Sequence, residues 1–410
     1  MLRNRQYTIL FSGQVVSTLG TNLFLLALPW YVYVSTNSKA DLAIVGFAGS
    51  LPALAGIFAG VFVDRWNKRL TMIAADAIRA VLAAAVGLIA LLPHTFPAII
   101  ALVLLLQLAG VLFGPAEMAL IPMVVGEEEV PGAMGLNQSG GAIAQLAGQA
   151  GGGALLMALG APLLFLANAA SFLVSVVSLL FIRTAEPSHT SQPHAFFKEW
   201  RAGFALFGRS RMILLIVSAA LVTNFGLAAF DIALTAWVRG PLHGNALWLG
   251  LVGAGFFLGV IAGGVSLGAI TRKLPLRATL IAGLITTGVV IGAVGLIANP
   301  YWTIAVLTVC GFSVGILNGS VGAMAIRVIP ESMRGRVFGL LGALSMAAAP
   351  AGIAVFGALM VYIPLQALFA TMGSLCVASG LAFFLPVKDD LARLQTIAAE
   401  DATGARGMPE

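Results

Sequence analysis

The chain is a series of long apolar runs separated by short polar stretches. A helix needs about 20 mostly apolar residues to cross a bilayer. Twelve runs of this length are present, near 7–34, 42–63, 70–91, 97–119, 134–158, 161–182, 212–237, 246–270, 276–298, 301–326, 337–360 and 365–386. Their connections are mostly short and hold turn residues, as in "PHTFP" and "ANPYW". The pattern predicts an all-α integral membrane protein with twelve transmembrane helices.

One connection, residues 183–211, is longer and divides the runs into six and six. Within it, four aromatic residues recur at helical spacing opposite basic residues, which predicts an amphipathic helix on the membrane surface: Phe197, Trp200, Phe204 and Phe207. The predicted organisation has four parts, namely an N-terminal six-helix bundle (1–182), a cytoplasmic linker (183–211), a C-terminal six-helix bundle (212–386) and a cytoplasmic tail (387–410).

Composition supports a membrane protein, and the lack of known catalytic motifs in the sequence argues against an enzyme. Hydrophobic residues make up 60% of the chain and charged residues 9%, whereas soluble domains hold about 25% charged residues. The sequence has no G-x-x-x-x-G-K-[ST] loop, no H-E-x-x-H motif and no clear metal-ligand spacing among its four histidines, so we expect no cofactor and no metal. Cys310 and Cys376 fall in apolar runs and are expected to be small core residues. The start, "MLRNRQY", leads directly into the first apolar run without the features of a cleavable signal peptide.

The basic residues predict the orientation in the membrane. With the N-terminus inside, 19 of the 22 Lys and Arg fall on the cytoplasmic side, Lys39 and Arg239 fall outside, and Arg79 lies within a span. Such a bias marks the cytoplasmic side of a membrane protein. We expect both termini in the cytoplasm of a bacterial-type inner membrane. The net charge of +6 then reflects topology and does not indicate a nucleic-acid partner.

The two halves of the chain resemble each other. "GIFAGVFVDRWNKR" (56–69) matches "GVIAGGVSLGAITRK" (259–273), and "EMALIP" (117–122) parallels "AMAIRV" (323–328). A repeat of this length predicts two pseudo-symmetric six-helix bundles with a transport path at their interface.

The segment "GVFVDRWNKR" resembles a signature of the major facilitator superfamily. Five residues fit the signature of its loop between spans two and three: Gly60, Asp64, Arg65, Lys68 and Arg69. "FGPAEMALIPMVV", "LANAASFLVS" and "IPESMRGRVFGLLGAL" are similar to the branch of drug:proton antiporters that holds macrolide-efflux proteins and enterobactin exporters. The resemblance implies a monomeric secondary active transporter that exports amphipathic, drug-like small molecules by alternating access, with protons entering in exchange.

Two departures from that branch leave other functions open. Gln149 stands where many antiporters have a proline in span five, and span four carries Gln107 but no arginine. The alternatives are an exporter of lipids, lysolipids or siderophores, a facilitator that needs no proton, and, from a different class, a membrane sensor that transports nothing.

Asp231 is the only acid that the sequence places well inside an apolar span, away from the cytoplasmic ends. A charge at the bilayer centre costs roughly 2.5–3.5 kcal/mol on insertion scales, so such residues usually face a cavity or a partner. Asn224 precedes it by seven residues and Thr235 follows it by four, which would place all three on one helical face. Our hypothesis is that Asp231 binds a proton or a cationic substrate. The alternative is a residue at the outer end of the span, wetted by water or paired with Arg239.

Other polar residues in the spans are candidates to line the same cavity. They are Gln138, Gln145 and Gln149 in span five, Asn22 and Trp30 in span one, and Asn318 in span ten. Packing between helices is the alternative for the glutamines, and an interfacial aromatic belt is the alternative for Trp30. The glycines of span eight, Gly255, Gly259 and Gly263, are expected to serve close helix packing.

Charges near the cytoplasmic ends of the spans suggest a gate between the bundles. Asp76 and Arg79 are three residues apart and can pair with each other. The other predicted members are the five residues of the loop signature, Glu117 at the end of span four, and Arg334 and Arg336 before span eleven. The signature residues are Gly60, Asp64, Arg65, Lys68 and Arg69. The alternative is charge pairing that stabilises the fold without any switching role.

Overall fold

The computed structural model describes residues 4–63, 65–183, 211–328 and 331–384. Within these ranges every regular element is a helix, and eleven helical segments are long and apolar enough to cross a membrane. The expectation of an all-α, multi-pass membrane protein is therefore confirmed. The predicted linker helix and the tail lie outside the described residues.

The second predicted span, 42–63, is present as two short helices and is the one predicted span missing from those eleven. Helix α2 (Lys39–Ser50) and helix α3 (Ala53–Val63) are 12 and 11 residues long, so neither reaches the length of a span alone. Pro52 stands at the break, and proline interrupts a helix because it lacks the backbone N–H that the ladder needs.

Two further spans that the sequence predicted as continuous are also broken. Residues 97–119 fall in α5 (Phe96–Gly110) and α6 (Phe113–Val125), with Pro115 in the first turn of α6. Residues 212–237 fall in α10 (Arg211–Leu227) and α11 (Phe230–Arg239). No proline marks this second break, so the hydrophobic pattern alone gave no indication of it.

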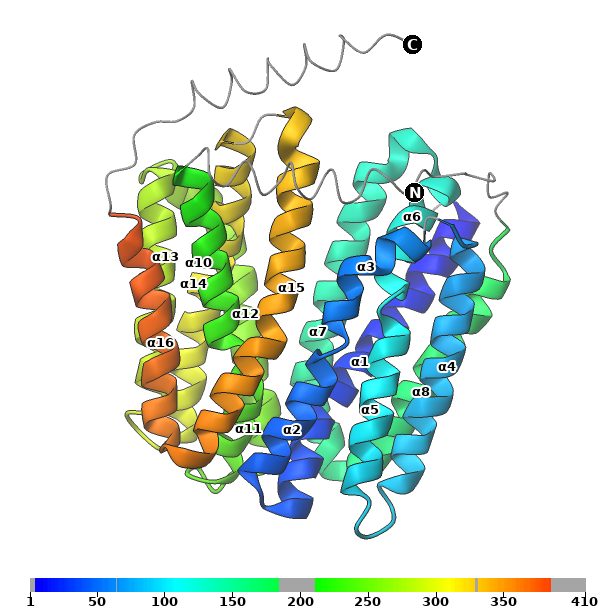
Figure 1. Cartoon of the computed structure of the whole chain (residues 1–410), viewed down its shortest axis with the longest axis horizontal. Coiled ribbons are helices and arrows are strands. Elements are labelled where there is room, and N and C mark those ends of the chain that lie inside the picture. The colour runs from blue at the N-terminus through cyan, green and yellow to red at the C-terminus, as the bar shows by residue number, and fades with distance from the viewer. Residues whose placement is uncertain (1–3, 64, 184–210, 329–330, 385–410) are drawn as a thin grey trace. The chain divides into compact units, whose positions relative to one another are not determined.

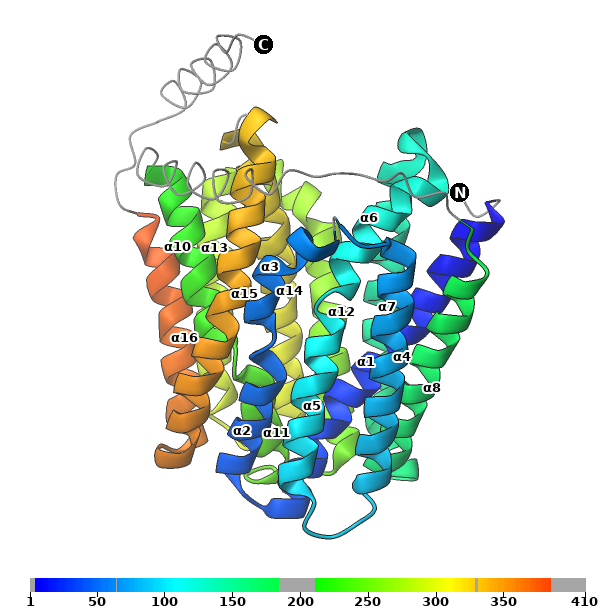
Figure 2. The same ribbon diagram turned by 45° about the vertical axis from the view of Figure 1, so that its right-hand side comes forward.

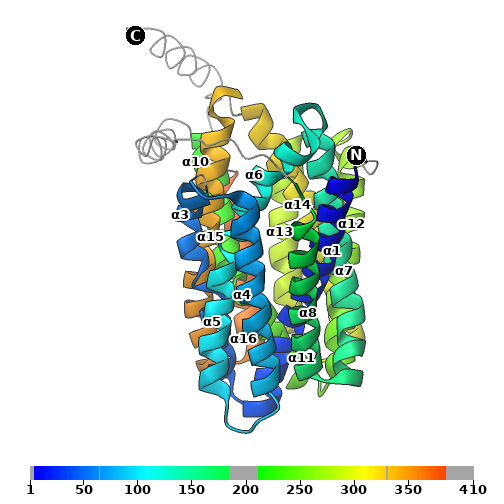
Figure 3. The same ribbon diagram turned by 90° about the vertical axis from the view of Figure 1, so that its right-hand side faces the viewer.

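The chain forms two compact units, and the first holds most of the N-terminal spans. Unit 1 consists of Met1–Ser191, Ala229–Ala254 and Ile353–Ile363. Its long helices are α1 (Arg5–Thr36), α4 (Lys68–Ile89), α7 (Val130–Leu159) and α8 (Ala161–Leu180), and the short 3-10 turn η1 (Glu127–Glu129) joins α6 to α7. Helix α8 packs against both α1 and α4, α7 packs on α1, and α5 lies beside α4 (Figures 1 and 3).

Unit 1 also includes segments from the C-terminal half of the sequence. These are α11, the first part of α12 (Ala246–Thr271) and the last part of α15 (Glu331–Tyr362). Gly250 of α12 packs on Gly153 of α7, and Gly357 of α15 packs on Ala43 of α2. The division at 183–211 stays a prediction from the sequence repeat.

Unit 2 consists of Gln192–Ala228, Gly255–Gly352 and Pro364–Glu410. Helix α13 (Leu276–Val294) packs against α14 (Pro300–Val328) and α16 (Leu365–Ala382), and α10 packs on α16 (Figure 2). Its apolar core includes Leu276, Leu280 and Leu284 of α13 and Phe383 after α16.

Both units use an arginine to cap the last helix of a sequence half. Arg69, near the start of α4, donates hydrogen bonds to the carbonyls of Leu179 and Leu180 at the end of α8. Arg277, near the start of α13, donates to the carbonyl of Phe383 just after α16. A cation at a helix C-terminus satisfies free carbonyls and complements the helix dipole. Each arginine is the second residue of its helix, although the sequence repeat pairs Arg69 with Lys273.

The glycines predicted to pack in span eight make very close helix contacts. A Cβ atom at Gly259 would stand 2.1 Å from the carbonyl oxygen of Thr308, and one at Gly263 would stand 2.1 Å from that of Phe312. A glycine of α14 packs equally closely on α12, because a Cβ atom at Gly311 would stand 1.9 Å from the carbonyl oxygen of Phe256. The packing interpretation of these glycines is confirmed.

An ion pair lies inside unit 1. Arg79 Nη1 is 3.0 Å from Asp76 Oδ1 in α4, and the Asp76 side chain has no exposed surface. The guanidinium stacks over the ring of Phe172 in α8, with Cζ 4.0 Å from the ring centroid. The expected pairing of Asp76 with Arg79 is confirmed. Asp76 Oδ2 and Arg79 Nε have no hydrogen-bond partner among the described residues.

Replacing Gly259 by alanine tests the contact between α12 and α14. Gly259→Ala should lower the free energy of unfolding by about 1–3 kcal/mol, because the helices must separate to admit the methyl group. The matched control is Gly264→Ala in the same helix, where a Cβ atom meets nothing within 4 Å. Alanine is the better helix former, so the control should keep or raise stability. Thermal unfolding of the purified protein in detergent measures both, and equal melting temperatures would contradict the close contact.

Removing one member of the buried ion pair should lower the free energy of unfolding. Arg79→Gln leaves the Asp76 carboxylate without its cation, and breaking a buried pair in this way costs about 3–5 kcal/mol. Adding Asp76→Asn to the same protein should recover most of the loss, while Arg239→Gln at an exposed position should change stability by less than about 0.5 kcal/mol. Denaturant titration of the variants decides this, and a double variant as unstable as Arg79→Gln would show that the unpaired charge is not the cause.

Candidate substrate-binding pocket

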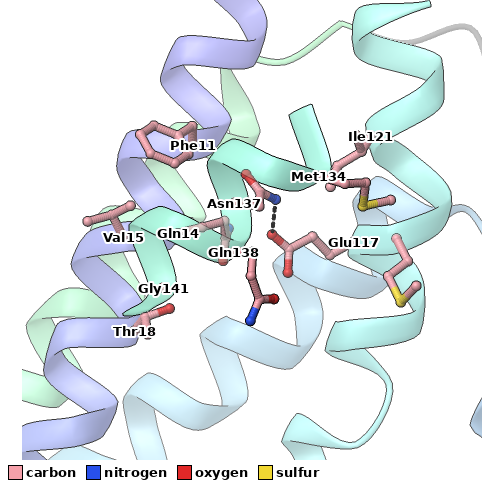
Figure 4. Close-up of a pocket in the computed structure, with 11 residues that line it drawn as sticks. Phe11, Gln14, Val15, Thr18, Glu117, Ile121, Met134, Asn137, Gln138 and Gly141 are labelled. Atoms are coloured by element: carbon pink, nitrogen blue, oxygen red, sulfur yellow. Dashed lines mark hydrogen bonds between the residues drawn. The ribbon is translucent and has the colours of Figure 1, made fainter. Parts of the chain in front are cut away.

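A pocket of about 300 Å³ lies in unit 1 where α1, α6 and α7 meet (Figure 4). Its lining combines apolar, amide and acidic side chains: Phe11, Gln14, Val15, Thr18, Glu117, Met118, Ile121, Met134, Asn137, Gln138 and Gly141. A mostly apolar lining with a few polar groups is typical of small-molecule sites.

The packing of α6 turns Glu117 toward the pocket. Phe113, Ala116 and Leu120 are buried at helical spacing and join the apolar core of this unit. Glu117 follows Ala116 and lies off that core face, on the side toward α7 (Figure 4).

Small residues bring α7 close to α1 beside the pocket. A Cβ atom at Gly140 would stand 2.6 Å from the ring of Phe11, and one at Gly148 would stand 2.7 Å from Cβ of Asn22. Glycines allow backbones to approach in this way. Gly141 is different, because nothing lies within 4 Å of a Cβ atom built there. It therefore borders the open part of the pocket.

Glu117 is held by an amide and has no cation near enough to pair with it among the described residues. Asn137 Nδ2 donates to Glu117 Oε1 over 3.2 Å (Figure 4). The hydroxyl of buried Tyr7 can donate to Asn137 Oδ1 at 3.2 Å or to the carbonyl of Ala133 at 2.9 Å. The amide of Asn137 is thus held with its NH₂ group toward the carboxylate.

The surroundings leave the charge of Glu117 unbalanced. Among the residues that line the pocket it is the one that carries a full charge. Asp76 lies within electrostatic reach of Glu117, but its charge is balanced by Arg79. Gln14 donates from Nε2 to Ser175 Oγ over 3.1 Å, and Ser175 lies beside Asp76. An ionised Glu117 would leave this region with a net charge of −1.

Asp231 lies in the first turn of α11, two residues after the break in its span. Its side chain is exposed, and no described residue forms an ion pair with it. The alternative of an ion pair between Asp231 and Arg239, both of which the structure describes, is not observed. The expectation that Asn224 and Asp231 share one helical face assumed a continuous helix. It is wrong, because α10 ends at Leu227 and α11 begins at Phe230. The free N–H groups at the start of α11 favour an acid there. Stabilisation of the helix start is therefore a structural explanation for an acid at position 231.

The other polar residues predicted to line a cavity lie in varied surroundings. Gln138 lines the pocket described above, whereas Gln145 and Gln149 do not. The Gln149 side chain lies against Gly253. Asn22 is buried and donates to the carbonyl of Thr18 in its own helix. Asn224 does the same with Ala220, Asn318 is exposed on α14, and Trp30 is half-buried on α1.

The residues of the predicted cytoplasmic gate are only partly described. Asp64 lies outside the described residues, Gly60 lies in α3, and Arg334 and Arg336 lie in α15 with undescribed side chains. Arg65 is exposed, Lys68 is buried, and Arg69 caps α8. Pairing across the two halves stays a prediction. The sequence assigned Glu117 to this gate. In the structure it lines the pocket and forms no ion pair among the described residues.

Sequence analysis did not single out several residues of the pocket. Asn137 precedes Gln138 and could have been noticed as part of the same polar pair, and Thr18 was one of several polar residues in span one. Phe11, Met118 and Met134 carry no pattern that separates them from other apolar residues in spans. Their grouping depends on how three helices pack.

Comparison with known proteins identifies the family. The sequence model of the family described as transmembrane secretion effector matches residues 1–403. The chain is 24% identical over 402 residues to the multidrug efflux pump Tap of Mycolicibacterium fortuitum, covering 92% of this chain and 95% of that one. It is 22% identical over 395 residues to macrolide efflux protein A of Streptococcus pyogenes, covering 95% and 96%.

Solved structures support the fold. The nucleoside transporter NupG superposes with a TM-score of 0.73 at 13% identity, over 93% of this chain and 98% of that one. A bacterial homologue of the human lysosomal transporter Spinster gives a TM-score of 0.67 at 16% identity, over 96% and 97%. With the family match across nearly the whole sequence, these comparisons show that the chain belongs to the transmembrane secretion effectors of the major facilitator superfamily.

Proposed function

We propose that this protein exports amphipathic small molecules from the cytoplasm by alternating access, in exchange for protons. The observation that carries the proposal is the match along almost the entire chain to relatives named as multidrug and macrolide efflux proteins. The orientation has both termini in the cytoplasm of an inner membrane, as the distribution of basic residues indicates. The transporter acts as a monomer surrounded by lipid and needs no cofactor.

Contacts within unit 1 support alternating access. Three contacts join spans of the N-terminal half to segments of the C-terminal half: Gly153 with Gly250, Gly46 with Ile232, and Ala43 with Gly357. A Cβ atom at Gly153 or Gly357 would stand closer than 3.0 Å to its neighbour, and one at Gly46 would stand 3.2 Å from the Ile232 side chain. If the two halves rock about a central path, these contacts must separate when the pathway opens on the side of the membrane where they lie.

Proton coupling needs an acid that can exchange its proton during the cycle. Asp231 suits this role because it is exposed, has no ion-pair partner among the described residues and follows a break in its span. Discontinuous helices often form the sites for coupling ions in transporters.

Replacing Asp231 tests the coupling. In everted vesicles that hold a pH gradient, candidate macrolides and lipophilic cations should release protons through the wild-type protein. Asp231→Asn should reduce this release at least tenfold, because the amide cannot carry a proton across. The control is Asp41→Asn, since Asp41 is also an acid in the first turn of a helix.

The outcomes separate the alternatives. Equal proton release by wild type and Asp231→Asn would remove this residue from the mechanism. Substrate export without proton release would indicate an uncoupled carrier. No flux with any compound would direct attention to lipids and then to a membrane sensor.

Joining Ala43 to Gly357 tests alternating access. With Cys310 and Cys376 replaced by serine, Ala43→Cys and Gly357→Cys should form a disulfide under oxidation. The Cβ atom built at Gly357 lies 2.9 Å from Cβ of Ala43, so a shift of about 1 Å between the helices gives the Cβ separation of about 3.8 Å that a disulfide needs. Export should stop in the oxidised protein and return on reduction, whereas each single cysteine variant should be insensitive to both treatments. Full export by the cross-linked protein would contradict rocking at this contact.

A further inference from the structure

We propose that the pocket between α1, α6 and α7 is a binding site for amphipathic organic monocations, with Glu117 as the counter-ion. This deepens the proposed function and rests on it for the direction of transport. It assigns Glu117 to ligand binding, a role distinct from that of Asp231.

The first argument is the unbalanced charge. Glu117 lies in a candidate membrane span, and a carboxylate there needs a partner because the surrounding lipid cannot solvate it. Asn137 supplies one neutral hydrogen bond, and the nearby Asp76 is already matched by Arg79. The position open for a partner is the pocket itself, which a cationic group can enter.

The second argument is the rest of the lining. Phe11 offers an aromatic ring and Met118 and Met134 offer polarisable thioethers. Aromatic faces attract organic cations, and methionine adapts to ligands of different shape. Gln14, Gln138 and Thr18 add hydrogen-bonding groups without a competing positive charge. The lining therefore suits a hydrophobic molecule with one positive charge and disfavours an anion.

The third argument is that the repeated fold does not require an acid here. The alignment of the two halves pairs "EMALIP" with "AMAIRV", so Glu117 corresponds to Ala323. Ala323 packs against the apolar core of unit 2. One half of the chain thus forms this part of the bundle with a methyl group, and the acid of the other half needs a reason beyond folding.

Binding to the purified full-length protein tests the site without any transport step. The probe is tetraphenylphosphonium, a permanent cation, and the reference is neutral triphenylphosphine oxide, with both measured by equilibrium dialysis. Glu117→Gln should weaken binding of the cation at least tenfold and change binding of the neutral compound by less than threefold. Glu128→Gln, at an exposed acid outside the pocket, should bind both compounds as the wild type does.

A steric variant tests the same site independently of charge. Gly141→Leu should fill the pocket and weaken binding of both compounds at least tenfold, since space is open at this position. Gly135→Leu is the matched control, because it lies in the same helix, is exposed and also has nothing within 4 Å of its Cβ position. Melting temperatures close to wild type would show that each variant is folded.

Three results would overturn the site. They are wild-type protein that does not bind the cation, Glu117→Gln that binds it within twofold of wild type, and Gly141→Leu that binds like Gly135→Leu. Cation binding that depends on Glu117 in a protein without export would leave the site standing and refute the proposed function. If the protein exports substrates but binds the cation equally well with and without the Glu117 carboxylate, the site is refuted and the proposed function is not.

Discussion

The backbone of a membrane span must satisfy its own hydrogen bonds, because lipid tails offer no donors or acceptors. This constraint explains why all regular elements in the described residues are helices. It also makes every interruption informative, since a break exposes N–H and C=O groups that need other partners. Three spans are broken, at Pro52, near Gly110 and after Leu227. Two of them carry the acids considered above, Glu117 in α6 and Asp231 at the start of α11.

Helix association in such a protein gains little from the hydrophobic effect and depends on close packing. The glycines of α12 and α14 fit against one another's backbone, and those of α7 fit against α1. The second contact has a functional consequence. Because Gly140 places α7 against Phe11, the neighbouring Asn137 and Gly141 border the pocket, and the amide of Asn137 reaches Glu117.

The sequence predicted the parts of this structure that depend on local pattern. Span positions follow from apolar run length, and the glycines of span eight and the pair of Asp76 with Arg79 follow from helical spacing. The break between α10 and α11 was not predicted, since no proline marks it and the apolar run continues through it. The helical face assigned to Asn224 and Asp231 was wrong for that reason. The pocket was missed because it depends on the packing of three helices that are distant in sequence. Arg69 was read as a gate residue from a motif, whereas its hydrogen bonds to α8 depend on tertiary structure.

The two halves share their architecture but differ in where they place charge. Arg69 and Arg277 cap corresponding helices, so the repeat preserves charges that the fold uses. Inside the spans the correspondence ends, because α4 carries Asp76 and Arg79 while α13 carries a buried leucine face and no acid. Glu117 likewise corresponds to an alanine. A second half that folds without these groups shows that the architecture does not require them. Asp76 and Arg79 balance each other as a buried ion pair, whereas Glu117 has no such partner among the described residues, and the proposed cation site gives it a reason beyond folding.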